Sequence, residues 1–121
     1  MQLRFTSVLA LALVHLAFQT PALAADSDAG LAVVADLAQI NGQALACQDM
    51  ATVAKAKKLM LAHAPKTPRY GTLFEESTNS SYLAQVRGTT ACPDSTTFSG
   101  KLDVLAKRLQ EALPAAPTGT R

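Results

Sequence analysis

The chain of 121 residues contains no tryptophan, and aromatic residues make up only 5% of it. A hydrophobic core must therefore be built mainly from leucine, valine, alanine and methionine. These side chains pack well between helices, whereas strands are enriched in β-branched and aromatic residues. The scarcity of aromatic residues thus favours an all-α fold.

The sequence also lacks a strong excess of charge. Eleven lysine and arginine residues stand against nine aspartate and glutamate residues, which gives a formal net charge of +2 at pH 7. Proteins that bind nucleic acid or anionic membranes through their charge usually carry a larger positive excess. We therefore expect neither a nucleic acid nor an anionic membrane surface as a partner.

No apolar run is long enough to span a bilayer, which takes roughly 20 residues in a helix. The longest run at the N-terminus, Val8–Phe18, follows the single charge of Arg4 and precedes the small-residue site Ala22-Leu23-Ala24. This order is typical of a secretory signal peptide, and a buried helix over the same residues is the alternative. We predict that residues 1–24 are cleaved and that the mature protein is exported, periplasmic or secreted, from a bacterium.

Cysteine is scarce too, with only Cys47 and Cys92, which lie 45 residues apart. Two cysteines in an exported chain are typical of one disulfide. They form no C-x-x-C motif and have no obvious activating neighbours in the sequence, so a redox pair or thiolate metal site is not favoured. We predict a structural disulfide that stabilises the folded state by about 4 kcal/mol, because it lowers the conformational entropy of the unfolded chain.

The most prominent feature that is present is an alanine-rich apolar segment, Leu31–Ala64. Its apolar residues recur at the helical period, which predicts one long helix with Cys47 near its middle. Asn41-Gly42 interrupts the pattern, and this pair could kink the helix, break it into a hairpin or allow another helix to approach closely. We favour a helix that is kinked at this pair but connected.

Two further helices are predicted. One begins at Thr67-Pro68, or at Thr72, and ends at Arg87-Gly88, with a polar middle that is a poor helix former. The last begins at Asp94 or Ser95 and ends at Pro114, with a regular apolar stripe. The expected fold is all-α, a small antiparallel bundle of three to four helices with one disulfide over residues 25–114, followed by a disordered tail at 115–121.

The helix lengths suggest how these elements pair. An antiparallel second helix would return the chain to the level of Cys47, so that the disulfide closes a helical hairpin. The half of the first helix after Cys47 would then have a partner, and the half before it would keep an unassigned apolar face. We expect that face to be one recognition surface.

Two groups of side chains are candidate sites. Met60 and His63, with Met50 nearby in sequence, could bind cuprous ion, but no second cluster completes a coordination shell and core packing is the preferred interpretation. A basic group near the end of the first helix could bind an anionic or acidic partner, although a solvated face is the simpler reading; its members are Lys55, Lys57, Lys58, Lys66 and Arg69.

No catalytic constellation is evident. Glu75 and Glu76 are adjacent and diverge by about 100° on a helix, so they cannot flank one bond. A serine–histidine arrangement built on His63 has nothing else to support it. We predict no cofactor and a non-enzymatic accessory protein that binds another exported protein or itself. The alternatives are a chaperone-like periplasmic stress protein and, third, a carrier of metal or a small ligand.

Overall fold

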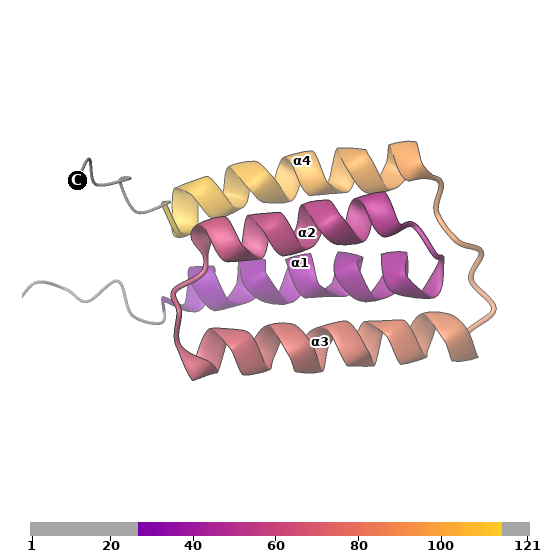
Figure 1. Ribbon diagram of the computed structural model, residues 1–121, viewed down its shortest axis with the longest axis horizontal. Coiled ribbons are helices and arrows are strands. Elements are labelled where there is room, and N and C mark those ends of the chain that lie inside the picture. The colour runs from indigo at the N-terminus through magenta and orange to yellow at the C-terminus, as the bar shows by residue number, and fades with distance from the viewer. Residues whose placement is uncertain (1–26, 115–121) are drawn as a thin grey trace, which may run out of the picture.

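The computed structural model describes residues 27–114, and these residues form four α-helices and no strand. The helices are α1 (Asp28–Ala46), α2 (Met50–His63), α3 (Pro68–Arg87) and α4 (Ser95–Ala112). Successive helices run in opposite directions (Figure 1). The predicted all-α bundle with one disulfide is therefore confirmed, while the predicted signal peptide 1–24 and tail 115–121 lie outside the described residues.

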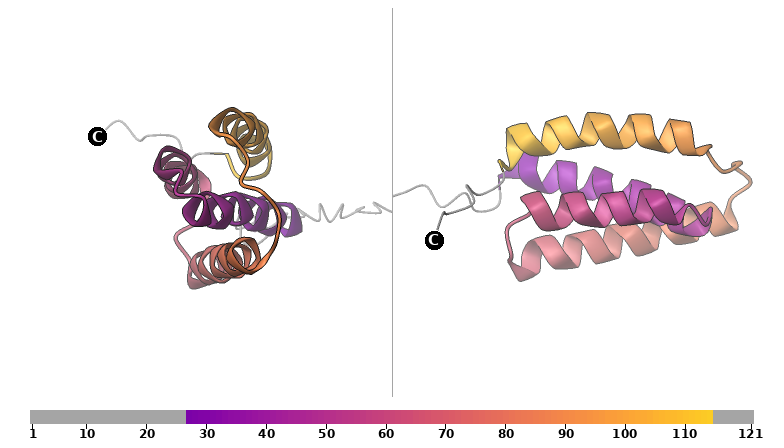
Figure 2. Two further views of the ribbon diagram at one scale, coloured as in Figure 1. Left: turned by 90° about the vertical axis from the view of Figure 1, so that its right-hand side faces the viewer. Right: turned by 45° about the horizontal axis from the view of Figure 1, so that its top comes forward.

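Helix α1 is the centre of the bundle. It contacts each of the other three helices, and α2 and α4 also contact one another. Helix α3 contacts only α1 and lies on the side of α1 opposite to α2 and α4, as the end-on view in Figure 2 shows. The molecule therefore consists of a three-helix unit, α1, α2 and α4, with α3 attached to its central helix.

The core lies inside the three-helix unit. Helix α4 contributes a stripe at helical spacing, with Phe98, Leu102 and Leu109 fully buried. Helix α3 contributes only Tyr70, whose hydroxyl lies near Gly30 and Leu113 at one end of the bundle. The other members of the core cluster come from α1, α2 and α4 and from the segments that follow α2 and α4: Val33, Val34, Leu37, Ile40, Ala44, Val53, Ala56, Ala64, Leu105 and Leu113.

The prediction of one long helix over Leu31–Ala64 is wrong. The chain turns back at Cys47–Asp49, where Gln48 adopts a positive φ of 59° and the carboxylate of Asp49 accepts a hydrogen bond from the Thr52 N–H at 3.0 Å. This aspartate caps the N-terminus of α2. Since the helix ends there, Ala51 and Ala54, which continue the helical period of Ala44 and Cys47 in the sequence, face solvent instead of the core.

Asn41-Gly42 has a different role from the one we favoured. Helix α1 continues through the pair, and Gly42 is buried against α3. A Cβ atom at Gly42 would collide with the Thr78 carbonyl oxygen and lie 2.8 Å from Ser81 Cβ. The glycine thus allows two helix backbones to approach closely, which was one of the three options that the sequence left open.

The polar middle of α3 forms the contact with α1. Thr78 Oγ1 donates to the Ala38 carbonyl at 3.3 Å and accepts from Asn41 Nδ2 at 3.2 Å. Ser81 Oγ donates to the Gln39 carbonyl at 2.8 Å. Small polar side chains suit this position because they let the helices approach at Gly42 while forming hydrogen bonds across the interface.

The predicted pairing of helices is also wrong in one respect. The helix that returns after α2 packs against α1, before Cys47, and no Cα atom of α3 lies within 8 Å of one in α2. The half of the segment before Cys47 is therefore in contact with all three other helices, and most of its large apolar side chains are buried. An open furrow between α2 and α3 remains instead.

Candidate functional site

The disulfide is where the sequence places it. Cys47 and Cys92 are joined by an S–S bond of 2.02 Å, with their Cα atoms 5.7 Å apart. Cys47 is half-buried at the end of α1, and Cys92 is exposed in the segment between α3 and α4. The bond therefore ties the far end of α3 to the central helix, which is a structural role.

Met60 and His63 are both engaged in packing. His63 Nδ1 lies 2.9 Å from the Leu113 carbonyl oxygen, to which it can donate a hydrogen bond at the end of α4. Met60 is half-buried against the core, whereas Met50 is exposed at the opposite end of α2. Within residues 27–114 no group of three histidine, cysteine, aspartate or glutamate side chains could hold a metal ion.

The predicted basic residues lie against different neighbours. Lys55 pairs with Asp103 of α4 at 2.8 Å, and Lys66 Nζ donates to the Leu61 carbonyl at 2.5 Å. Lys58 is exposed on the outer face of α2. Arg69 lies on the far flank of α3, where it lines a depression with Leu31.

The two adjacent glutamates diverge as expected. Glu76 shares the depression of Arg69 on one flank of α3. Glu75 lines the furrow on the other flank, together with Lys57 of α2. The pair therefore cannot act on one substrate bond, in agreement with the angle between adjacent helical positions.

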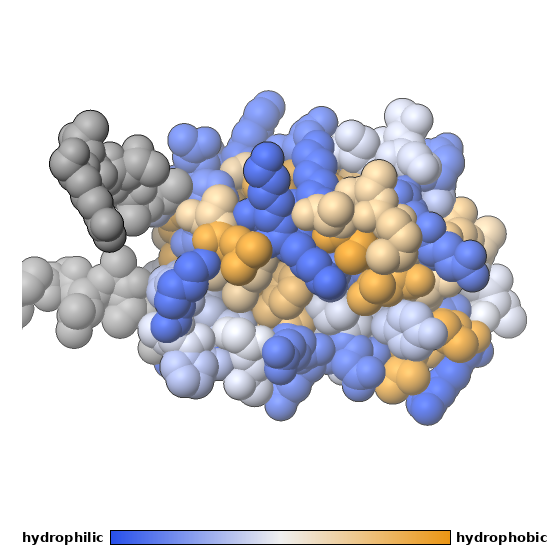
Figure 3. Space-filling model, viewed as in Figure 1, coloured by the Kyte–Doolittle hydropathy of each residue, from blue (hydrophilic) through white to orange (hydrophobic). Residues whose placement is uncertain are grey.

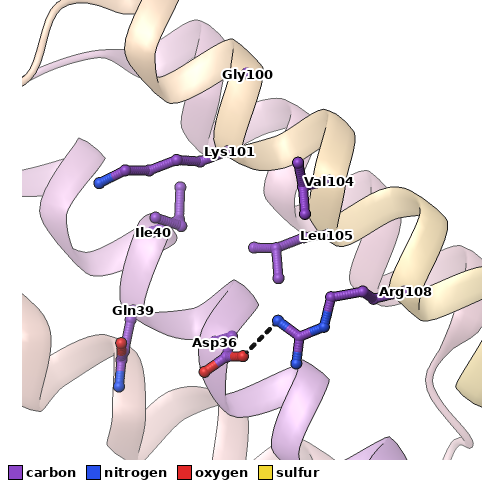
Figure 4. Close-up of a pocket in the computed structure, with 8 residues that line it drawn as sticks. All are labelled: Asp36, Gln39, Ile40, Gly100, Lys101, Val104, Leu105 and Arg108. Atoms are coloured by element: carbon purple, nitrogen blue, oxygen red, sulfur yellow. Dashed lines mark hydrogen bonds and ion pairs between the residues drawn. The ribbon is translucent and has the colours of Figure 1, made fainter.

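A depression lined largely by apolar surface lies between α1 and α4; we call it the α1–α4 groove. Its volume is about 450 Å³, and it is lined by Asp36, Gln39, Ile40, Gly100, Lys101, Val104, Leu105 and Arg108 (Figure 4). Ile40 and Leu105 are largely buried, whereas Val104 is 59% exposed. The groove therefore presents an apolar surface that no residue of 27–114 covers.

Charged side chains border this apolar surface. Arg108 Nη1 donates to Asp36 Oδ2 at 2.7 Å, which links α4 to α1 beside the groove (Figure 4). The Lys101 side chain lies on the other side of Val104, near Ile40, and forms no ion pair among the described residues. Since the charge of Arg108 is balanced by Asp36, Lys101 leaves the groove with an unbalanced positive charge.

Sequence reasoning missed this groove. The stripe Lys101, Val104 and Arg108 recurs at steps of three and four, one flank away from the buried stripe of α4. The signal that could have revealed it is Val104, an aliphatic residue among the charged residues of an otherwise polar helix face. Val104 alone does not predict a groove, because the groove also needs Ile40 of α1 on its other side.

Comparisons of the chain with protein-family models, with curated proteins and with solved structures found no match. Among the described helices, none combines the length and the apolar character that crossing a membrane requires. The surfaces of the described residues are therefore the features that bear on function.

Proposed function

We propose that this chain is an exported, non-enzymatic accessory protein that binds another exported protein through the α1–α4 groove. The observation that carries the proposal is the exposed Val104 above the apolar floor of Ile40 and Leu105. Concave apolar surfaces that remain exposed on a small protein are typical of sites that bind a partner.

The charges of the groove indicate the chemistry of the partner. An aliphatic side chain of the partner would pack against Val104 and Leu105, while a carboxylate beside it would face the ammonium group of Lys101. Asp36 is already occupied by Arg108, so a basic partner would gain little there. The best fit is an acidic segment of a protein with at least one exposed aliphatic residue.

The export and the non-enzymatic character have separate support. The Cys47–Cys92 disulfide suits an oxidising compartment, and the N-terminal pattern is that of a signal peptide. His63, the histidine that general-base chemistry would need, directs Nδ1 at the Leu113 carbonyl. Binding is therefore the activity for which the molecule offers a surface.

The test is site-specific photo-cross-linking in the exporting cell. A photoreactive residue at Val104 should capture one partner, whereas the same residue at Lys107, on the outer face of α4, should not capture it. Capture of the same proteins from both positions, or of none from Val104, would contradict the proposal.

A groove-filling variant supplies the matched control. A Cβ atom at Gly100 meets nothing within 4 Å, so that alanine fits there without a clash and a leucine side chain would start from open space beside the groove. Gly100→Leu should obstruct the groove and abolish capture from Val104, while Gly100→Ala should preserve it. If both variants retain capture, the partner does not occupy the groove.

A further inference from the structure

A second unoccupied surface lies between α2 and α3; we call it the α2–α3 furrow. It has a volume of about 400 Å³, its floor is formed by Asn41 and Leu45 of α1, and its walls come from Lys57 of α2 and from residues of α3. The wall residues on α3 are Glu75, Thr78, Asn79 and Tyr82. The furrow exists because α2 and α3 both pack against α1 and do not contact one another.

Most of the exposed large apolar side chains belong to the two helices that border this furrow. Of the five large hydrophobic residues that are exposed in residues 27–114, four belong to α2 and α3, namely Met50 (59%), Leu61 (69%), Tyr82 (39%) and Val86 (57%). Figure 3 views this side of the molecule and shows apolar residues over α2 and at the end of α3 that interrupt the hydrophilic surface. A face of this kind favours contact with a protein over contact with water.

Two stripes with the same spacing border the furrow. Helix α2 carries Met50, Lys57 and Leu61, and α3 carries Glu75, Tyr82 and Val86. In each stripe the second residue is seven positions after the first, and the third is four positions after the second. These steps keep the three residues of a stripe on one face of their helix.

The two walls carry opposite charges. Lys57 and Glu75 line the same furrow, yet neither forms an ion pair within the described part of the chain. A purely acidic partner would bring a like charge to Glu75, and a purely basic one would do so to Lys57. A complementary partner must place an acidic group opposite Lys57 and a basic group opposite Glu75. A second copy of this molecule, rotated by 180°, does so with its own Glu75 and Lys57.

We propose that the α2–α3 furrow is the interface of a two-fold symmetric homodimer. With the symmetry axis along the furrow, α2 of one copy lies over α3 of the other. Lys57 of each copy then faces Glu75 of the second copy, which gives two equivalent ion pairs. In a two-fold interface every such contact is formed twice.

The register of the stripes supports this arrangement. Helices α2 and α3 are antiparallel (Figures 1 and 2), so that a step back along α2 matches a step forward along α3. Met50 is seven residues before Lys57 and Tyr82 is seven after Glu75, and each step spans roughly 10 Å. When Lys57 faces Glu75, Met50 therefore faces Tyr82, a contact between sulfur and an aromatic ring that is favourable in proteins.

The area indicates a dimer of modest affinity. Helix α2 has 14 residues and is about 21 Å long, and two helices side by side are about 20 Å wide. The face, roughly 420 Å² on this estimate, is smaller than the interfaces of stable complexes, which bury about 800 Å² on each partner. Dimerisation should therefore be weak and depend on concentration.

Charge reversal tests the proposal. Lys57→Glu and Glu75→Lys each place like charges at both contact points, so each variant should remain monomeric in sedimentation equilibrium at concentrations where the unmodified protein dimerises. A mixture of the two variants should form a heterodimer, because every contact then joins opposite charges. Lys107→Glu makes the same change of charge on α4 and should dimerise as the unmodified protein does.

Circular dichroism establishes that each variant is folded before it is compared. An unmodified protein that stays monomeric up to millimolar concentration would overturn the proposal. Dimers of Lys57→Glu alone, or a mixture that remains monomeric while the unmodified protein dimerises, would also overturn it, because the contact would then lie elsewhere. Gly100→Leu should not affect dimerisation, which separates this interface from the α1–α4 groove.

Discussion

Helices α3 and α4 are similar in length, with 20 and 18 residues, but they are held in the molecule in different ways. Helix α4 buries four large apolar side chains against α1 and α2, whereas α3 buries only Tyr70. Full burial of one leucine or phenylalanine contributes about 1.5–3 kcal/mol. Helix α4 is therefore an integral part of the core, and α3 is an attachment to it.

What α3 lacks in apolar burial it gains from other contacts. Its middle approaches α1 closely at Gly42 and forms hydrogen bonds to the backbone of α1 through Thr78 and Ser81. Each such bond contributes only about 0.5–1.5 kcal/mol net. The Cys47–Cys92 disulfide then tethers the far end. The comparison indicates that close approach, hydrogen bonds and a covalent bond together hold a helix whose apolar packing, by Tyr70, Leu73 and Phe74, is confined to its first half.

Removal of the disulfide should have the largest effect and should fall mainly on α3. The double variant Cys47→Ala with Cys92→Ala should lose about 4 kcal/mol of unfolding free energy, because the loop that the bond closes is no longer constrained. Native-state hydrogen exchange should show that the amides of α3 lose protection before those of α4. Unchanged thermal stability in oxidising buffer, or equal loss over both helices, would contradict the assigned role.

Truncation of a leucine should have the second largest effect, and its cost in stability should be greater in α4 than in α3. Leu102→Ala, at a fully buried position of α4, should cost about 3 kcal/mol, because it leaves a cavity in the core. Leu83→Ala, at a half-buried position of α3, should cost about 1 kcal/mol or less. Urea unfolding measures both values, and equal costs would mean that α3 is as well packed as α4.

Two glycine substitutions should act in opposite directions. Gly42→Ala should destabilise the protein by about 2 kcal/mol, because the added methyl group overpacks the contact between α1 and α3. Gly100→Ala should stabilise it by up to about 1 kcal/mol, because alanine is the better helix former and nothing lies near its Cβ. Thermal unfolding compares the two variants directly, and a neutral Gly42→Ala would show that the helices can separate without cost.

Acidification should have the smallest effect on stability. It should weaken the first turn of α4 but not the first turn of α3. The backbone N–H of Thr97 donates to the Asp94 carboxylate at 2.7 Å, and this bond lowers the pKa of Asp94 from its usual 3.8. Because the folded-state pKa is lowered, the stabilisation is present above pH 3.8 and is lost as the pH falls through the folded-state value. The N-cap of α3, Thr67, makes no side-chain hydrogen bond and cannot titrate.

Hydrogen exchange across this pH range measures the effect. The first turn of α4 should lose protection in acid in the unmodified protein. Asp94→Asn provides the matched control, because asparagine also caps a helix but does not titrate. An equal loss in both proteins would mean that the Asp94 carboxylate is not responsible. The pKa of Asp49 is lowered in the same way, chiefly by the backbone N–H of Thr52, so the start of α2 should respond like that of α4.

Local signals predicted much of this fold and little of the candidate sites. Thr67-Pro68 and Asp94 mark the starts of α3 and α4 correctly, and Gly88 follows the last residue of α3. The residues of the predicted basic group have different neighbours, because Lys55 pairs with Asp103 of α4 whereas Arg69 lines a depression beside α3. The α1–α4 groove could not be predicted, since it requires that Val104 and Ile40, from distant parts of the chain, border the same space.

The sequence by itself determined the helical class, the Cys47–Cys92 disulfide and most helix ends, because period, caps and cysteine pairing are properties of short segments or of composition. Only the tertiary structure decided that the chain turns at Gln48, that α1 is central and that α3 lies on α1 instead of α2. The physical reason is that these choices depend on how closely two backbones can approach. At Gly42 a missing side chain lets α3 lie on α1, and the furrow between α2 and α3 follows from that arrangement.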